Sequence, residues 1–138
     1  PYDNYNLNTS HFMAATIKKV IDSKDVINVW GDGTEKRDLL YVNDLCDFID
    51  KAIKRQKLKF RIYNAGLGKA YSIKSIVKKT INLSNKNIVI KWNKSAPTIK
   101  TNICLNCNLA KKELGWSPNT TLTEGIKNTI SWYQKNFK

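Results

Sequence analysis

The sequence has no long apolar run and few cysteines. None of its 138 residues lies in an apolar stretch near the roughly 20 residues that span a membrane, and the chain shows no signal peptide. Its 3 cysteines leave one thiol unpaired in any disulfide scheme, so nothing indicates an oxidising compartment. We therefore expect a cytoplasmic protein with a globular core and no membrane partner.

Histidine is scarcer still, and this bears on metal binding. Cys104 and Cys107 form a C-x-x-C pair, but a four-ligand zinc site needs a second pair of ligands, and the only histidine, His11, lies far away in the sequence. We expect buried or half-buried thiols and no metal site.

Acidic residues are outnumbered, with 11 Asp and Glu against 24 Lys and Arg and a net charge of +13. A chain this basic is a candidate for nucleic-acid binding that weakens steeply with salt. The lysines, however, are spread over every segment at the polar positions of expected helices, and they form no dense block with aromatics. We expect no nucleic acid as partner; an anionic small molecule such as a diphosphate fits the same charge.

The first expected elements are a helix and a strand. Apolar residues recur at helical spacing between residues 12 and 21, and Thr9 or Ser10 can cap that helix. The segment "VINVW", residues 26–30, alternates and is rich in β-branched residues, which predicts a strand. The "GDG" that follows supplies the residues that a tight turn with positive φ requires.

A second strand and helix follow the turn. The segment "DLLYV", residues 38–42, is a short apolar run that suits a buried strand. Asn43 is a good N-cap for a helix over residues 44–54. The segment "RIYNA", residues 61–65, predicts a further strand that ends at a glycine.

The remaining elements continue the alternation. Ser72 is expected to start a helix, residues 87–92 to form a strand, and Gly115 to end a short helix. Thr121 and Glu124 offer a capping box for a last amphipathic helix. The helix after Ser72 is expected to bury Ile73, Ile76, Val77, Thr80 and Ile81. Strands alternating with helices predict an α/β fold with a small mixed sheet.

Arg37 stands just after the glycine turn, at the start of the expected second strand. A guanidinium in that place can hold a phosphate or carboxylate with two parallel hydrogen bonds. A surface ion pair of Arg37 with Asp38 or Glu35 is the competing interpretation.

Four segments, in order, carry a resemblance to a known family: "PYDNYN", "WGDGTEKRDLLYVNDL", "YNAGLGKAYSI" and "AKKELGWSPNTTLTEGI". They resemble the extended short-chain dehydrogenase/reductases, the NAD(P)-dependent nucleotide-sugar epimerases, dehydratases and reductases. The resemblance implies a Rossmann-type fold of which residues 1–138 are the C-terminal substrate-binding portion. The N-terminal dinucleotide-binding part would then be missing.

Within that family, "DNYNLNTSHFMAATIKK" and "VWGDGT" are most similar to the GDP-L-fucose synthases. This implies epimerisation of a 4-keto nucleotide sugar at two carbons, then hydride transfer to the ketone. By the same resemblance, His11 is the catalytic acid of the epimerisation, Lys19 a basic residue near the substrate and Arg37 the residue that holds the diphosphate. Asn4 lines the sugar pocket or a solvated loop, and Trp30 stacks on the base or belongs to the core.

Several positions depart from the fucose-synthase pattern. Lysines replace arginine at residues 18 and 19, Ala14 replaces a proline, and "APTIKTNICLN" differs from the family's Pro-Arg/Lys stretch. A UDP-sugar 4-epimerase or sugar 4,6-dehydratase relative, or a non-catalytic nucleotide-sugar-binding member, is therefore the alternative.

Two family motifs are absent from the chain. It has no glycine-rich dinucleotide turn after a first strand, and no tyrosine is followed four residues later by a lysine. We expect NADP or NAD to be bound by the missing N-terminal part and the fragment alone to be inactive. The resemblance implies a homodimer for the full-length protein.

Overall fold

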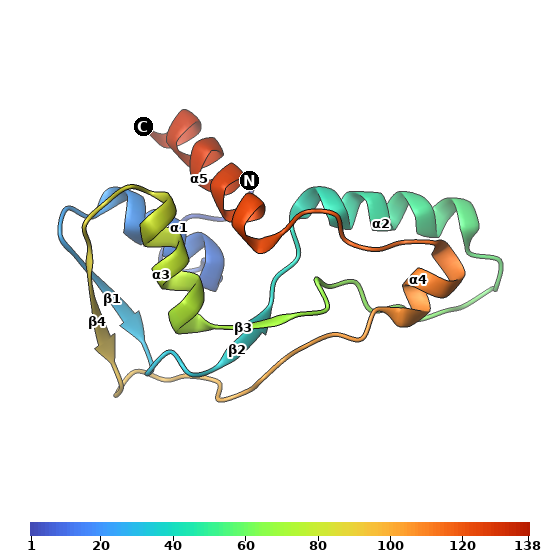
Figure 1. Cartoon of the computed structure of the whole chain (residues 1–138), viewed down its shortest axis with the longest axis horizontal. Coiled ribbons are helices and arrows are strands. Elements are labelled where there is room, and N and C mark those ends of the chain that lie inside the picture. The colour runs from blue at the N-terminus through green and yellow to red at the C-terminus, as the bar shows by residue number, and fades with distance from the viewer. The chain divides into compact units, whose positions relative to one another are not determined.

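The computed structural model describes all residues 1–138, and the chain folds into two units (Figure 1). The first unit comprises Pro1–Glu35, Ser72–Lys100 and Thr123–Lys138, and the second Lys36–Tyr71 and Thr101–Leu122. Helices and strands alternate along the chain, which confirms the predicted α/β class. None of the helices is both long and apolar enough to cross a membrane.

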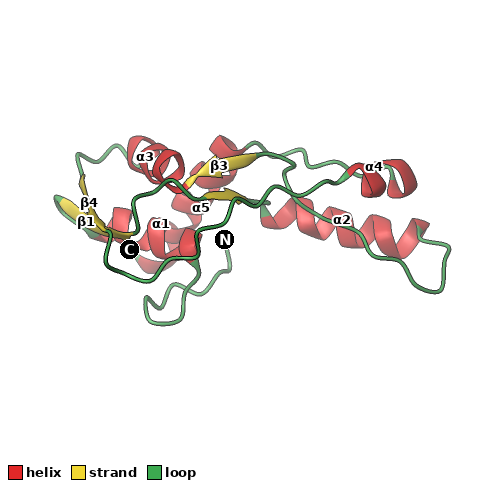
Figure 2. Cartoon of the chain, turned by 90° about the horizontal axis from the view of Figure 1, so that it is seen from below, coloured by secondary structure: helices red, strands yellow, loops and turns green.

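The first unit is built on a two-stranded parallel sheet (Figure 2). Strands β1 (Val26–Trp30) and β4 (Val89–Asn93) pair so that Val26 lies opposite Val89. In β1, Ile27 and Val29 are buried while the other three residues are exposed, which is the alternation that the sequence predicts.

Three helices complete the first unit. They are α1 (Phe12–Asp22), α3 (Ile73–Leu83) and most of α5 (Leu122–Phe137), and α1 packs against α3. The predicted start of α3 is confirmed, because the Ser72 hydroxyl accepts a hydrogen bond of 3.1 Å from the Ser75 N–H. All five apolar or small residues predicted for its inner face are buried.

The second unit contains β2 (Lys36–Asp38), most of β3 (Ala70–Ser72), α2 (Val42–Arg55) and α4 (Asn108–Leu114). Its core is Ala110, Leu114 and Trp116, with α2 packed against α4. Helix α4 ends as predicted at Gly115, whose φ of 62° is left-handed.

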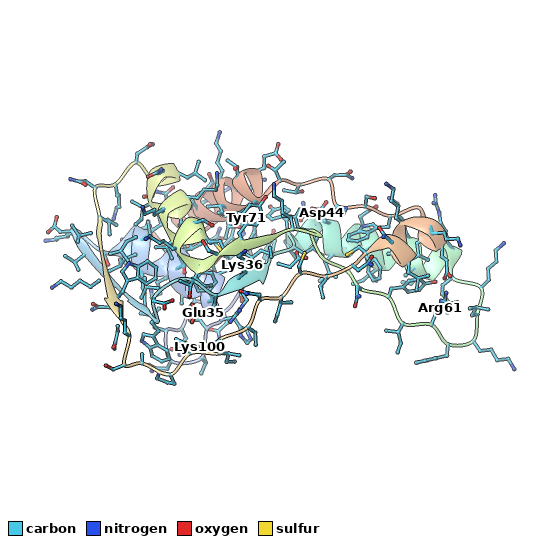
Figure 3. The ribbon with its side chains drawn as sticks, turned by 60° about the horizontal axis from the view of Figure 1, so that its bottom comes forward. Glu35, Lys36, Asp44, Arg61, Tyr71 and Lys100 are labelled. Atoms are coloured by element: carbon cyan, nitrogen blue, oxygen red, sulfur yellow. The ribbon has the colours of Figure 1, made fainter.

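Asp44 ties α2 to the chain beyond α4. Its carboxylate accepts hydrogen bonds of 3.0 Å from the N–H groups of Asn119 and Thr120, and its carbonyl accepts one of 3.1 Å from the Trp116 indole. The side chain is only 5% exposed and lies at the start of α2 (Figure 3). Its bonds satisfy donors that would otherwise be left unpaired in a partly buried loop.

Two predicted strands are wrong. Residues 39–41 are not in a strand, because only 36–38 have partners, in β3 and in a bridge from Lys36 to Asn102. Residues 61–65 make no backbone-to-backbone hydrogen bond, so no strand forms there. The strands also form two separate two-stranded sheets instead of one.

Two predicted helix caps also differ. Helix α1 begins after His11 instead of Thr9 or Ser10, and α2 begins after Tyr41 instead of Asn43. Neither cap residue hydrogen-bonds the helix through its side chain. The helices themselves are where the periodicity predicts them, because apolar spacing determines the helical stretch and capping only adjusts its first residue.

Candidate functional site

The glycine turn after β1 is tightly packed by the chain's own side chains. Gly31 and Gly33 have φ values of 82° and 79°, as the sequence predicts. A Cβ on Gly33 would stand 2.5 Å from Cη2 of Trp92, and one on Gly31 would stand 2.9 Å from Cγ2 of Thr98. The turn therefore leaves no cradle for a dinucleotide phosphate, and its glycines are required by close packing.

Arg37 lies at the centre of β2, and its side chain is half-buried. Its Nη1 donates hydrogen bonds to the carbonyls of Lys36, at 2.9 Å, and Thr101, at 2.8 Å, and to the Thr101 hydroxyl at 3.3 Å. The guanidinium is thus fixed against a segment 64 residues further along the chain. A fixed orientation is what bidentate recognition of a diphosphate requires.

His11 lies at the N-cap of α1 with an exposed side chain that makes no capping bond. The loop before it is held by Asn4, whose amide donates to the Thr9 hydroxyl at 2.8 Å and accepts from the Asn6 N–H at 2.9 Å. An open hollow of about 580 Å³ adjoins this loop, lined by residues 3–8, Lys18 and Phe137. Asn4 therefore stands in an ordered loop that leads directly to His11.

Lys19 is placed differently from His11. Eight residues along α1 separate their Cα atoms by about 12 Å at a rise of about 1.5 Å per residue. The Lys19 ammonium donates a hydrogen bond of 3.0 Å to the carbonyl of Asn28 on β1. Burial lowers the pKa of the Lys19 ammonium below its usual value. Lys19 is thus fastened to the sheet at the far end of the helix.

Trp30 ends β1, and its indole is 59% exposed. The alternative that Trp30 is a core residue is therefore wrong. The core tryptophan of this chain is Trp116, which is fully buried. An exposed indole at a strand end is available for stacking on a planar ligand.

A charged cluster holds residues 61–63 to α4. The Arg61 guanidinium donates two hydrogen bonds to Glu113, one of them at 3.0 Å from Nε, and the Tyr63 hydroxyl donates a third at 2.9 Å (Figure 3 labels Arg61). The bonds from Arg61 and Tyr63 hold the pKa of Glu113 below its usual range. All three partners point toward one another, so this cluster is a structural tie.

The cysteines form no disulfide, and no group of three or more His, Cys, Asp or Glu side chains is arranged to hold a metal ion. Cys104 and Cys107 line an open hollow of about 400 Å³ in the second unit. Desolvation raises the pKa of the half-buried Cys107 thiol. That shift favours the neutral thiol over the thiolate.

Two carboxylates that organise the second unit are not apparent from the sequence. Asp38 and Asp44 each accept hydrogen bonds from backbone N–H groups far along the chain. An acidic residue in the first turn of a helix is a common pattern, but Asp44 bonds residues 75 and 76 positions away. Local spacing carries no signal for such partners.

Comparison with known proteins shows which enzyme family this chain resembles. Residues 1–66 match the model of the NAD dependent epimerase/dehydratase family. These residues are similar to that family, and the resemblance that the four sequence segments predict is confirmed.

Individual relatives match nearly the whole chain. The chain is 30% identical over 136 residues to GDP-L-colitose synthase of Yersinia pseudotuberculosis. The aligned region covers 96% of this chain and 44% of that protein. The chain is 28% identical over 144 residues to a probable GDP-L-fucose synthase of Oryza sativa subsp. japonica, covering 99% of this chain and 42% of that protein. The chain thus spans less than half the length of these relatives.

A solved structure supports the fold. The dTDP-glucose 4,6-dehydratase of Bacillus anthracis, in complex with NAD, superposes with a TM-score of 0.76 at 25% identity. The match covers 91% of this chain and 40% of that chain. The fold is therefore that of part of a Rossmann-type extended short-chain dehydrogenase.

Proposed function

We propose that this chain is the nucleotide-sugar-binding part of an NAD(P)-dependent enzyme that epimerises and reduces a 4-keto nucleotide sugar, as its likeness to GDP-L-colitose and GDP-L-fucose synthases suggests. The observation that carries the proposal is Arg37. It lies within the stretch that matches the family, and its guanidinium is fixed by Thr101. In this role Arg37 holds the diphosphate of the nucleotide sugar.

His11 supplies the proton chemistry in this proposal. Epimerisation beside a ketone needs one group to remove a proton from carbon and another to return one from the opposite face. The exposed imidazole at the start of α1 is free of capping bonds, so nothing in the helix end occupies its nitrogens. Asn4, in the adjoining ordered loop, is proposed to contact the sugar.

Trp30 and Lys19 are the other two residues that we propose to bind the substrate. The exposed Trp30 indole offers a face on which the nucleotide base can stack. An ammonium carries three donors, and the bond from Lys19 to Asn28 uses one of them. The proposed role of Lys19 is to place positive charge beside the sheet, where this charge favours an anionic substrate.

We propose that this chain is part of a longer protein, the parent. Its other part is proposed to bind the NADP or NAD, because the glycine turn of this chain is filled by its own side chains. The parent is further supported by two rows of exposed apolar residues in the second unit. The first row lies on α2 at helical spacing and consists of Leu45, Ile49 and Ile53. The second row alternates along the unpaired segment after α2 and consists of Leu58, Phe60 and Ile62.

The second row alternates with the tie to α4. Phe60 and Ile62 are 77% and 70% exposed, whereas Arg61 and Tyr63, between and after them, bond Glu113. Residues 60–63 therefore have the side-chain alternation of a strand but lack a neighbouring strand. A strand from the rest of the parent, together with its apolar layer, is proposed to cover both rows.

A sugar 4,6-dehydratase is the second candidate, because the solved dehydratase is 25% identical over most of the chain. The two functions are separated by assaying the parent. With a GDP-4-keto-6-deoxy sugar and NADPH we expect loss of NADPH absorbance and a new 6-deoxy sugar. Turnover of a dTDP- or UDP-hexose to its 4-keto-6-deoxy product, without consumption of NADPH, would favour the dehydratase. Tight binding of either substrate without turnover would identify a non-catalytic member.

The 138-residue chain alone is expected to bind neither NADH nor NADPH. The pyrophosphate of a dinucleotide is bound by backbone N–H groups of a glycine turn that leads into a helix. In this chain the glycine turn packs against Trp92 and is followed by strand β2 instead of a helix. Isothermal calorimetry on the isolated chain checks this, with the parent as the positive control. A micromolar dissociation constant for the isolated chain would contradict the assignment of cofactor binding to the other part.

A further inference from the structure

The Asp38 carboxylate gathers three backbone N–H groups from two distant segments. Its Oδ1 accepts from Leu67 at 2.7 Å, and its Oδ2 accepts from Gly68 and Leu105, both at 3.0 Å. Leu67 and Gly68 present successive N–H groups, the arrangement of an anion-binding nest. Asp38 is therefore the resident anion of a concave backbone site.

The backbone around Asp38 is shaped to admit it closely. A Cβ on Gly66 would stand 3.0 Å from the Asp38 Oδ2, so a larger residue there would press on the carboxylate. Gly68 has a left-handed φ of 71°, a conformation that favours glycine, and its N–H donates to the same oxygen atom. Bonds from several N–H groups to one carboxylate are among the stronger hydrogen bonds in proteins.

Asp38 and Arg37 hold the two ends of one segment. Because successive side chains of a strand point to opposite faces, the two residues leave β2 in different directions. Arg37 bonds the carbonyl of Thr101, and Asp38 bonds the N–H of Leu105. Between them, the Ile103 N–H donates to the Lys36 carbonyl at 3.2 Å. Residues 101–105 are thus fastened to β2 at both ends and in the middle.

We propose that Asp38 is the positioning residue of Arg37: by anchoring Leu105, it fixes the Thr101 carbonyl that orients the guanidinium toward the diphosphate of a nucleotide sugar. The inference rests on the proposed function, in which Arg37 holds that diphosphate. Asp38 itself contacts no substrate. Without this anchor the segment 101–105 is tied to β2 only through Lys36 and Arg37, so its Leu105 end can shift. A small displacement of a positioned cation weakens its grip.

A purely structural role for Asp38 is the competing explanation, and Asp44 provides the matched control. Asp44 is also an aspartate of the second unit that accepts backbone N–H bonds, from Asn119 and Thr120. Its bonds do not involve residues 101–105. Asp44→Asn therefore removes the same kind of interaction without touching the anchor of Arg37.

The experiment uses the parent with GDP as the probe, and UDP if GDP does not bind. Calorimetry gives the dissociation constant and thermal unfolding gives Tm for Asp38→Asn, Asp44→Asn, Arg37→Ala and the double variant of Asp38 and Arg37. An amide has one oxygen where the carboxylate has two, so at least one N–H group loses its partner in Asp38→Asn. We expect Asp38→Asn to raise Kd about tenfold. Asp44→Asn lowers Tm and leaves Kd unchanged.

The double variant separates positioning from stability. If Asp38 acts through Arg37, Asp38→Asn changes Kd by less than about twofold once Arg37 is alanine. The positioning role is overturned if Asp38→Asn changes Kd equally in the presence of Arg37 and of its alanine replacement. It is also overturned if Asp38→Asn changes Kd no more than Asp44→Asn does. Neither result contradicts the Arg37 clamp, that is, the binding of the diphosphate by Arg37. An unchanged Kd in Arg37→Ala overturns the clamp instead, and with it the positioning role. A parent that binds neither nucleotide overturns both.

A measurement on the unaltered parent covers the case in which Asp38→Asn does not fold. If the anchor and the clamp are coupled, the nucleotide that stabilises Arg37 also stabilises the bonds of Asp38. We expect GDP to slow hydrogen exchange at the amides of Leu67, Gly68 and Leu105 at least as much as at Asn119. Slowing at none of these three, with bound GDP confirmed by calorimetry, overturns the proposal.

Discussion

Replacing His11 with asparagine in the parent slows deuterium entry beside the ketone of a 4-keto nucleotide sugar by about 100-fold or more. The substrate is incubated in heavy water without reduced cofactor, and mass spectrometry follows deuterium at the carbons flanking the ketone. Asparagine preserves a polar side chain of similar reach but cannot exchange a proton with carbon at neutral pH. Hydride transfer to an already epimerised ketone is expected to survive.

Loss of folding does not explain such a result. His11 occupies the N-cap of α1 without a capping bond, and asparagine is among the residues that cap helices best. The variant should therefore unfold at the same temperature as the wild type or slightly above it. Deuterium entry at the wild-type rate would remove His11 from the mechanism and move the parent toward a 4-epimerase or dehydratase.

Arg37→Ala is expected to weaken binding of a nucleoside diphosphate to the parent by about 1.5–3 kcal/mol, because a charge-assisted pair of hydrogen bonds is lost. Arg37→Lys should recover only part of this loss, since an ammonium cannot reproduce the planar two-point contact. Calorimetry with GDP alone isolates the diphosphate contribution from that of the sugar.

Lys36→Ala is the matched control for charge. Lys36 neighbours Arg37 on β2, is exposed, and contributes its backbone to the bridge with Asn102. Its removal also deletes one positive charge, so it should change affinity only slightly and in a salt-dependent way. Equal losses in the two variants would mean that net charge and not a fixed guanidinium attracts the nucleotide. Unchanged affinity in Arg37→Ala would leave Arg37 with a structural role in place of a binding role.

The helices and β1 were predictable because their signals are local. Apolar spacing determines which residues of α3 face inward, and alternation does the same for β1. The strand expected at residues 61–65 has the right composition but no partner in this chain, and a strand exists only as a pair. Sequence pattern therefore located every helix but not every strand.

The site divides in the same way. The position of Arg37 after the glycine turn followed from the sequence, whereas its partner Thr101, 64 residues away, did not. The same holds for the bonds of Asp38 to Leu105, 67 residues away. Such contacts depend on how segments meet after folding, and no spacing rule encodes them.

The division of the chain into two units has a consequence for how it can be cut. The backbone passes from one unit to the other four times, after Glu35, Tyr71, Lys100 and Leu122. Neither unit is a continuous stretch of gene, so no single truncation or protease cut releases one of them whole. A chimaera that exchanges one unit with a relative must join several fragments at once. The two units must therefore be exchanged together. Each unit is assembled from segments that are far apart in the sequence, so its folding carries the entropic cost of closing long loops.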